Sequence, residues 1–282
     1  MTESTLDPAV LEKWIGRSEQ RTDIIGAQAA QFMQATMDQQ PTLQDGDMLP
    51  HGWHWLYFLE AKPMSALGRD GHPLRGGLLP PVALPRRMWA GTRLQFHSPI
   101  NIGDSINRVT TIKDVKVKSG KSGALCFVTV LHEFWRHQHH LMSEEHDIVY
   151  RQDPQPGVTP PVPPLAEQNA EIVKTITPSA VLLYRYSALT FNGHRIHYDI
   201  DYCRDVEGYP GLVFHGPLSA TLMLNLLSGS LPARSIRQFS FRAISPLYAD
   251  RPFTLNLRKT TEGYSIWATN PDGYLAIQAS AS

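Results

Sequence analysis

The sequence predicts an α+β protein made of two similar units in one chain. A proline-dense segment, residues 151–164, divides the 282 residues near their middle and suits neither a helix nor a central strand. On each side of it, a segment with helical periodicity precedes several alternating strands. We therefore expect a first unit at 1–150, a linker at 151–165 and a second unit at 166–282.

The first half is expected to contain one helix and a pair of strands. Apolar residues recur at helical spacing over residues 23–37. Strands over 105–118 and 124–135 flank the glycine-rich turn at 119–123. Both alternating sets of the second strand are largely apolar, which predicts burial on both of its faces.

The second half repeats this layout. Helices are expected over 178–189 and 217–228, the latter with proline in its first turn, where helices tolerate it. Four strands follow, at residues 236–243, 253–259, 264–269 and 274–279. A short echo, Ser98-Pro in one half and Ser245-Pro in the other, suggests a duplication.

Composition excludes several classes of partner. The formal net charge is zero, so neither a nucleic acid nor an anionic membrane gains general electrostatic attraction. No apolar run approaches the ~18 residues of a membrane span, and the first eight residues do not form a signal peptide. Cys126 and Cys203 are too few for a disulfide framework. A cytoplasmic protein is expected.

The most informative stretch is Asn192-Gly-His-Arg-Ile-His-Tyr-Asp199, followed by a glycine-rich loop at 208–217 and an apolar helical run. It brings two imidazoles, a carboxylate and an amide onto a short turn ahead of a glycine at a helix start. Imidazole titrates near neutral pH, and unpaired N–H groups at a helix start can hold a developing oxyanion. These groups suit proton transfer beside a carbonyl.

These residues resemble the signature of the MaoC-type (R)-specific enoyl-CoA hydratase and dehydratase family. The first half is similar to the family's N-terminal domain, through the segments 52–58, 67–73, 79–89 and 147–151, and is expected to be the non-catalytic half, with the catalytic motif in the second half. The resemblance implies a double hot-dog fold, in which two antiparallel sheets each wrap a helix. It also implies hydro-lyase activity on an acyl-CoA substrate, with no separate cofactor.

One departure from the family signature concerns the proton-transfer groups. Mapped onto this chain, the family histidine is His197 and the following acid is Asp199. The family's catalytic aspartate is replaced by Asn192, and its asparagine by His194. An amide cannot accept a proton, so Asn192 can only orient water or substrate.

The remaining roles follow from chemistry and from the resemblance. His197 is the expected proton-transfer group, with Asp199 orienting it and His194 either assisting or standing as an ordinary loop histidine. Gly216, at the start of the following helix, is implied to supply the oxyanion hole. His215 beside it contacts the substrate or only packs.

The resemblance is strongest to family members that hydrate short branched dicarboxylic enoyl-CoA esters. It implies conversion of itaconyl-CoA or mesaconyl-C4-CoA to citramalyl-CoA, a reaction of itaconate degradation. Arg195 and Arg87 are the expected contacts for the substrate's anionic groups. Two alternatives stay open: a 3-hydroxyacyl-thioester dehydratase acting on other acyl-CoA or acyl-carrier-protein substrates, and a non-catalytic acyl-CoA-binding protein.

No metal site is expected. The run at 137–140 contains three histidines but reads as an exposed hairpin turn without an ordered acid or cysteine partner. A homodimer is compatible with the sequence, which does not fix the oligomeric state, the acyl chain or the stereochemistry.

Overall fold

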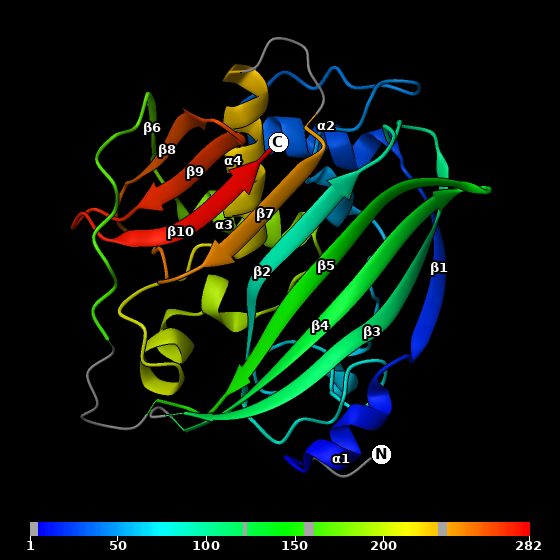
Figure 1. Ribbon diagram of the computed structural model, residues 1–282, viewed down its shortest axis with the longest axis vertical. Helices are drawn as coiled ribbons and strands as arrows, with labels where there is room; N and C mark the ends of the chain where they lie inside the picture. Colours follow the sequence, from blue (N-terminus) through cyan, green and yellow to red (C-terminus); the bar gives the residue numbers. More distant parts are fainter. Residues whose placement is uncertain (1–4, 121–122, 155–160, 231–235) are drawn as a thin grey trace.

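One continuous antiparallel sheet of ten strands organises the molecule (Figure 1). The computed structural model describes residues 5–120, 123–154, 161–230 and 236–282. The strand order is β1-β3-β4-β5-β2-β7-β10-β9-β8-β6. The five strands of the first half therefore lie on one side of the β2–β7 seam, and the five of the second half lie on the other.

The strands of the first half are long and those of the second half are short. The first five are β1 Ser18–Ile24, β2 Arg86–Phe96, β3 Ser105–Gly120, β4 Gly123–Arg136 and β5 His139–Arg151. The second five are β6 Ile172–Ile176, β7 Gln238–Ala243, β8 Phe253–Thr260, β9 Gly263–Thr269 and β10 Leu275–Ala281.

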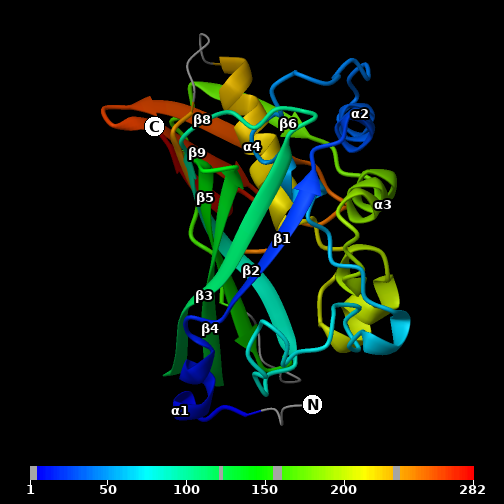
Figure 2. The same cartoon turned by 90° about the vertical axis from the view of Figure 1, so that its right-hand side faces the viewer.

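Three of the helices lie on one face of the sheet, with α4 nearest to it (Figure 2). The α-helices are α1 Pro8–Leu11, α2 Ala27–Thr36, α3 Ala180–Leu189 and α4 Gly216–Ser230. Short 3₁₀ turns are η1 Glu12–Trp14, η2 Trp53–Leu56, η3 Met64–Ala66 and η4 Arg195–His197, and η5 Tyr202–Val206 is a π-helical turn. No helix of the described residues is both long and apolar enough to span a membrane.

The two halves are related by a pseudo-twofold axis at the β2–β7 seam. In both halves a strand and a helix precede further helical segments and then four strands, and the sheet order is its own mirror about the seam. Arg93 pairs with Ser240 at the centre of the seam. This arrangement confirms the α+β class and the duplicated layout that the sequence predicts.

Most predicted elements are confirmed, with shifted ends. The helix expected from residue 23 begins only at Ala27, because residues up to Ile24 pair with β3 as strand β1. A strand containing Phe96 was expected and is confirmed as β2, whereas β1, β5 and β6 were not predicted. Residues 155–160 of the expected linker lie outside the described residues.

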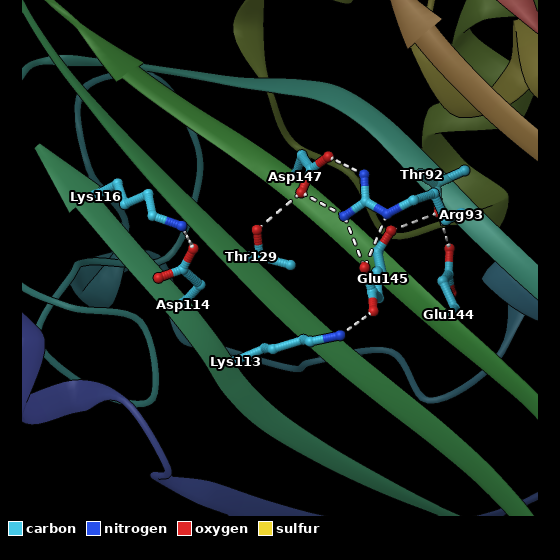
Figure 3. A network of polar contacts seen from close by, with 9 residues as sticks. All are labelled: Thr92, Arg93, Lys113, Asp114, Lys116, Thr129, Glu144, Glu145 and Asp147. Atoms are coloured by element: carbon cyan, nitrogen blue, oxygen red, sulfur yellow. Dashed lines mark hydrogen bonds and ion pairs between the residues drawn. The ribbon is translucent and has the colours of Figure 1, made fainter. Parts of the chain in front are cut away.

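Burial of β4 on both faces is only partly correct. Cys126, Val128 and Val130 are buried, whereas Leu125 and Thr129 on the other face are half-buried. That outer face carries a polar network between strands (Figure 3). In it, the Arg93 guanidinium contacts the carboxylates of Glu145 and Asp147 on β5, which also meet Lys113 and Thr129.

The core differs between the two halves. In the second half, α4 packs against the sheet through eight buried side chains. In the first half, the equivalent position holds only the single turn η2 and a buried polar cluster around Glu144. The Glu144 carboxylate accepts hydrogen bonds from Trp55 Nε1 at 2.9 Å and Thr92 Oγ1 at 3.1 Å, and it lies 3.0 Å from His54 Nε2.

Candidate active site

Two glycine-containing loops, one from each half, cross at the centre of the site. A Cβ on Gly71 would lie 1.9 Å from the Gly193 carbonyl oxygen, so only glycine allows this approach. Gly71 also has a φ of 85°, in the left-handed region. The backbone N–H of Arg195 donates to the Asp70 carbonyl at 3.0 Å. The crossing fixes the Asp70-Gly-His72 segment against the Asn192–His197 motif.

The crossing produces a row of four imidazoles. The ring centroids of His72 and His194 are 4.2 Å apart, and those of His194 and His197 are 5.4 Å apart. The His197 ring stacks on that of His215 with a centroid distance of 3.6 Å and an interplanar angle of 18°. The motif histidines are therefore brought together with His72, which the sequence did not single out.

The central histidine, His197, is buried and held in one orientation. Its Nδ1 lies 2.7 Å from the Val213 carbonyl oxygen, and a carbonyl can only accept, so Nδ1 carries the proton. Burial lowers the pKa of His197 to about 4, against the smaller opposing effect of the Val213 hydrogen bond. At neutral pH the ring is therefore neutral, with the lone pair on Nε2 available to accept a proton.

His215 links the imidazole row to the start of α4. Its Nε2 lies 2.8 Å from Ser187 Oγ on α3, and burial followed by the neighbouring His197 lowers its pKa well below the usual value. The next residue, Gly216, is the first of α4, where backbone N–H groups lack intrahelical acceptors. A Cβ on Gly216 would lie 2.6 Å from Trp89 Cε3, so the indole packs directly on the glycine.

Asp70 supplies a carboxylate beside the imidazole row, and its contacts are with His72. Asp70 Oδ2 lies 2.9 Å from His72 Nδ1, and Oδ1 accepts the His72 N–H at 3.0 Å. Burial alone would raise the pKa of Asp70, but its hydrogen bonds with His72 and the nearby Arg87 guanidinium bring it below the usual value. The Asp-Gly-His spacing in the first half was the signal for this pair.

Asn192 shapes the turn that carries the motif. Its Oδ1 accepts the His194 N–H at 3.0 Å, and the preceding Phe191 has a φ of 48°. The residue at the family's catalytic-acid position therefore stabilises a tight turn after α3. His194 is buried, and burial followed by the neighbouring His72 lowers its pKa well below the usual value.

The expected pairing of Asp199 with His197 is wrong. Residues 195–197 form a 3₁₀ turn and not an extended segment, so the two side chains do not share a side. Asp199 accepts hydrogen bonds from Tyr202 N at 3.0 Å and from the Arg195 guanidinium at 2.7 Å. The backbone bond from Tyr202, then the Arg195 bond, lowers the pKa of Asp199.

Of the two expected arginines, Arg195 is engaged and Arg87 is available. Arg195 is paired with Asp199 and lies over the Tyr202 ring at 4.2 Å. Arg87 is half-buried on β2 and lowers the pKa of both Asp70 and His72 through its charge. Among the described residues, no carboxylate lies within 4.0 Å of the Arg87 guanidinium.

The cluster of Asp70, His72 and His194 has the ligand types of a metal site. Its three donor atoms lie within 4.8 Å of one another. However, the carboxylate is already bonded to His72, and Arg87 and Arg75 raise the local positive potential. The donor set therefore suits proton transfer better than cation binding. A cavity of about 540 Å³ lies elsewhere, and none of these site residues lines it.

Comparison with known proteins identifies the family of this chain. Residues 52–249 match the model of the hydroxyacyl-thioester dehydratase type 2 family. A mesaconyl-C4-CoA hydratase from Chloroflexus aurantiacus is 44% identical over 94% of this chain and 95% of its own length.

Two solved structures share the fold at low sequence identity. A MaoC-like dehydratase from Phytophthora capsici has a TM-score of 0.69 and 10% identity, covering 97% of both chains. A Mycobacterium tuberculosis protein described as a double hot-dog fold has a TM-score of 0.56 and 13% identity, covering 95% of this chain and 96% of its own. The ten-stranded sheet with its mirrored helices is thus a double hot-dog fold.

Proposed function

The chain belongs to the MaoC-like hydroxyacyl-thioester dehydratase type 2 family and is a hydro-lyase, and from that premise we propose that it hydrates a short branched dicarboxylic enoyl-CoA. The 44% identity with the Chloroflexus mesaconyl-C4-CoA hydratase supports mesaconyl-C4-CoA as the substrate. The product would be citramalyl-CoA, formed by adding water across the double bond conjugated with the thioester.

One observation carries the proposal: a neutral imidazole of fixed tautomer lies beside the start of a buried helix. His197 presents an unprotonated Nε2, because Nδ1 is bonded to the Val213 carbonyl. The ring stacks on His215, which directly precedes Gly216 at the first turn of α4. A thioester whose oxygen meets the N–H of Gly216 would place its acyl carbons next to this ring.

The proposed reaction uses the groups of both loops. His197 Nε2 takes a proton from water as the water oxygen bonds to the β-carbon. The electron pair of the double bond moves toward the thioester oxygen, where the Gly216 N–H stabilises the enolate. The α-carbon then takes a proton, which restores the thioester and returns His197 to its neutral form. Asp70 and His72 hold the water and the His194 ring in place.

Arg87 is the proposed contact for the distal carboxylate of the acyl group. It stands beside the Asp70–His72 pair without a carboxylate partner among the described residues. Removal of its charge should therefore raise KM for a dicarboxylic acyl-CoA and leave KM for an uncharged acyl chain nearly unchanged.

The direct test is a panel of enoyl-CoA esters followed by the loss of conjugated thioester absorbance. A higher kcat/KM for mesaconyl-C4-CoA than for crotonyl-CoA would support the dicarboxylic substrate. The reverse order would favour the alternative, a 3-hydroxyacyl-thioester dehydratase acting on other acyl chains. Binding of every ester without turnover would contradict hydratase function and favour a binding protein.

Itaconyl-CoA imposes one further chemical requirement. Its double bond is β,γ to the thioester, so water cannot add in conjugate fashion until a proton has moved from the α-carbon to the γ-carbon. The same base beside the same oxyanion donor could perform this isomerisation before hydration. Turnover of itaconyl-CoA in deuterated solvent should place deuterium at the α-carbon of the product, and turnover that leaves the α-carbon unlabelled would exclude this route.

A further inference from the structure

The cavity of about 540 Å³ lies at the seam, between residues of the first half and the segment that leads into β7. It is bounded by the loop before η2, the end of β2 and the start of β7. Its walls are mainly apolar, and the side chains used below are His51, His54, Phe96, Met142, Ile236 and Arg237.

This cavity is the pseudo-twofold counterpart of the region at the start of α4, where Gly216 lies. Leu49 N donates to the Ile100 carbonyl at 2.8 Å, as Phe214 N donates to the Leu247 carbonyl at 2.8 Å. Two residues beyond these donors stand His51 in the first half and Gly216 in the second. The chain segments that frame the two places are thus held by the same backbone hydrogen bonds.

The partners across the seam are also equivalent. Because Arg93 pairs with Ser240 on the axis, Trp89 of β2 corresponds to Ile236, four residues before Ser240. Gly216 packs on Trp89, and His51 Nε2 correspondingly lies 3.4 Å from the Ile236 carbonyl oxygen. The smaller Ile236 leaves open the space that the indole fills on the other side.

The polar groups at this cavity suit an acyl thioester. The His54 ring lines it with Nε2 tied to buried Glu144, which leaves Nδ1 as the nitrogen that can meet a ligand. Burial lowers the pKa of His51, which therefore stands neutral beside Phe96 at neutral pH. Arg237 at the rim is exposed and has no carboxylate within 4.0 Å in the described part of the chain.

We propose that this cavity is a second binding site for a short acyl thioester, occupied without hydration. The acyl chain would pack on Phe96, Met142 and Ile236, and an anionic group of the coenzyme would meet Arg237. No counterpart of the Asn192–His197 motif borders the cavity, so the ligand would be held without a base positioned as His197 is. The thioester class rests on the proposed function.

Binding stoichiometry with butyryl-CoA tests this proposal, since a saturated ester cannot be hydrated. Equilibrium dialysis should give two equivalents per chain for the native protein and for His197→Ala. Arg237→Glu, at an exposed position, should weaken the second equivalent at least ~10-fold. His51→Trp should fill the cavity and abolish binding of the second equivalent. Both variants should keep the native kcat for hydration.

One equivalent in the native protein, or two undiminished equivalents in both cavity variants, would overturn the proposal. Displacement of the second equivalent by free butyrate as readily as by butyryl-CoA would overturn the thioester assignment. Melting temperatures of both variants identify any loss caused by unfolding. If no enoyl-CoA is hydrated while two equivalents bind, the proposed function fails and the second site stands.

Discussion

The two halves of the chain share a topology but fill their cores differently. In the second half a fifteen-residue helix, α4, lies against the sheet and begins beside the candidate active site. In the first half the four-residue turn η2 takes its place, and the remaining space holds the Glu144 cluster and the cavity at His51. Glu144 pairs with Leu94 across the sheet, and its counterpart Ala279 pairs with Phe241.

This difference shows how a duplicated fold divides its roles. A small residue at position 279 lets α4 approach the sheet, and the helix then offers its first N–H groups to a ligand. At the equivalent position in the first half, a carboxylate needs the imidazoles and indole around it to be stable in the core. That half instead contributes its 68–73 loop, which carries Asp70 and His72 across to the other half's site.

The largest expected difference between the halves is the effect on activity of replacing His197, in the second half, compared with a histidine of the first half. Replacing His197 with Ala should lower kcat about a thousandfold, because it removes the group that accepts the proton from water. The control is His137→Asn, in the exposed turn of the first half, where Asn tolerates the φ of 55°. Steady-state hydration rates that are equal for the two variants would remove His197 from the site.

The Glu144 cluster gives the largest expected effect on stability. Glu144→Gln should lower the free energy of unfolding by about 3 kcal/mol, since it leaves the buried imidazole of His54 and the half-buried imidazole of His146 without their anionic partner. His146 Nε2 is 2.7 Å from Glu144, within ion-pair distance although without hydrogen-bond geometry. Glu145→Gln, the next residue on the solvent-facing side, should cost less than about 1 kcal/mol.

Denaturant titration of both variants measures this contrast. Equal destabilisation by the two substitutions would mean that the first-half core does not depend on a buried charge. Hydration activity of folded Glu144→Gln should stay near the native value, because the polar contacts of Glu144 go to His54, Trp55, Thr92 and His146 and to none of the imidazoles beside His197.

Stability should fall in mild acid because His197 is buried in its neutral form. Its pKa is lowered from 6.5 to about 4, so between these values the unfolded chain binds more protons than the folded one. The contribution of His197 to the free energy of unfolding is therefore fully present above pH 6.5. It decreases as the pH falls toward 4, by up to roughly 3 kcal/mol. The free energy of unfolding of His197→Gln should fall less between pH 6.5 and pH 4 than that of the native protein. The same pH dependence in both proteins would contradict a buried, neutral His197.

The close packing of Gly216 predicts a smaller loss. Gly216→Ala places a Cβ against the rigid Trp89 indole and should destabilise the fold by about 1–3 kcal/mol, with reduced kcat/KM. Gly229→Ala, in the same helix with nothing within 4 Å of the new Cβ, should be neutral or stabilising by up to about 1 kcal/mol. Thermal unfolding that ranks the two variants in the opposite order would reject tight packing at Gly216.

Much of the fold was readable from local pattern, and the site was readable only in part. Apolar periodicity predicted the helices at 180–189 and 216–230. Alternation between turns predicted the strands β8 to β10. Strand β6 was missed because four of its five residues are exposed and its pairing partner β8 comes from a distant part of the sequence. Apolar periodicity alone carries no information about such long-range pairing.

At the site, the sequence predicted the position of the motif correctly, but the expectation that Asp199 lies beside His197 was wrong. Asp199 was expected beside His197 because an extended segment places alternate residues on one side, and the 3₁₀ turn at 195–197 removes that relation. Asp70 lies more than a hundred residues from the motif and reaches it only because Gly71 and Gly193 let two loops cross. No spacing rule within either segment predicts that contact.

A comparison of Asp70→Asn with Asp199→Asn tests whether hydration depends on a carboxylate of the first half. Both substitutions keep the shape of the side chain and remove one negative charge. We predict that kcat for hydration falls about a hundredfold in Asp70→Asn and less than about threefold in Asp199→Asn. A larger loss in the Asp199 variant, with Asp70→Asn near the native rate, would contradict a site assembled across the two halves.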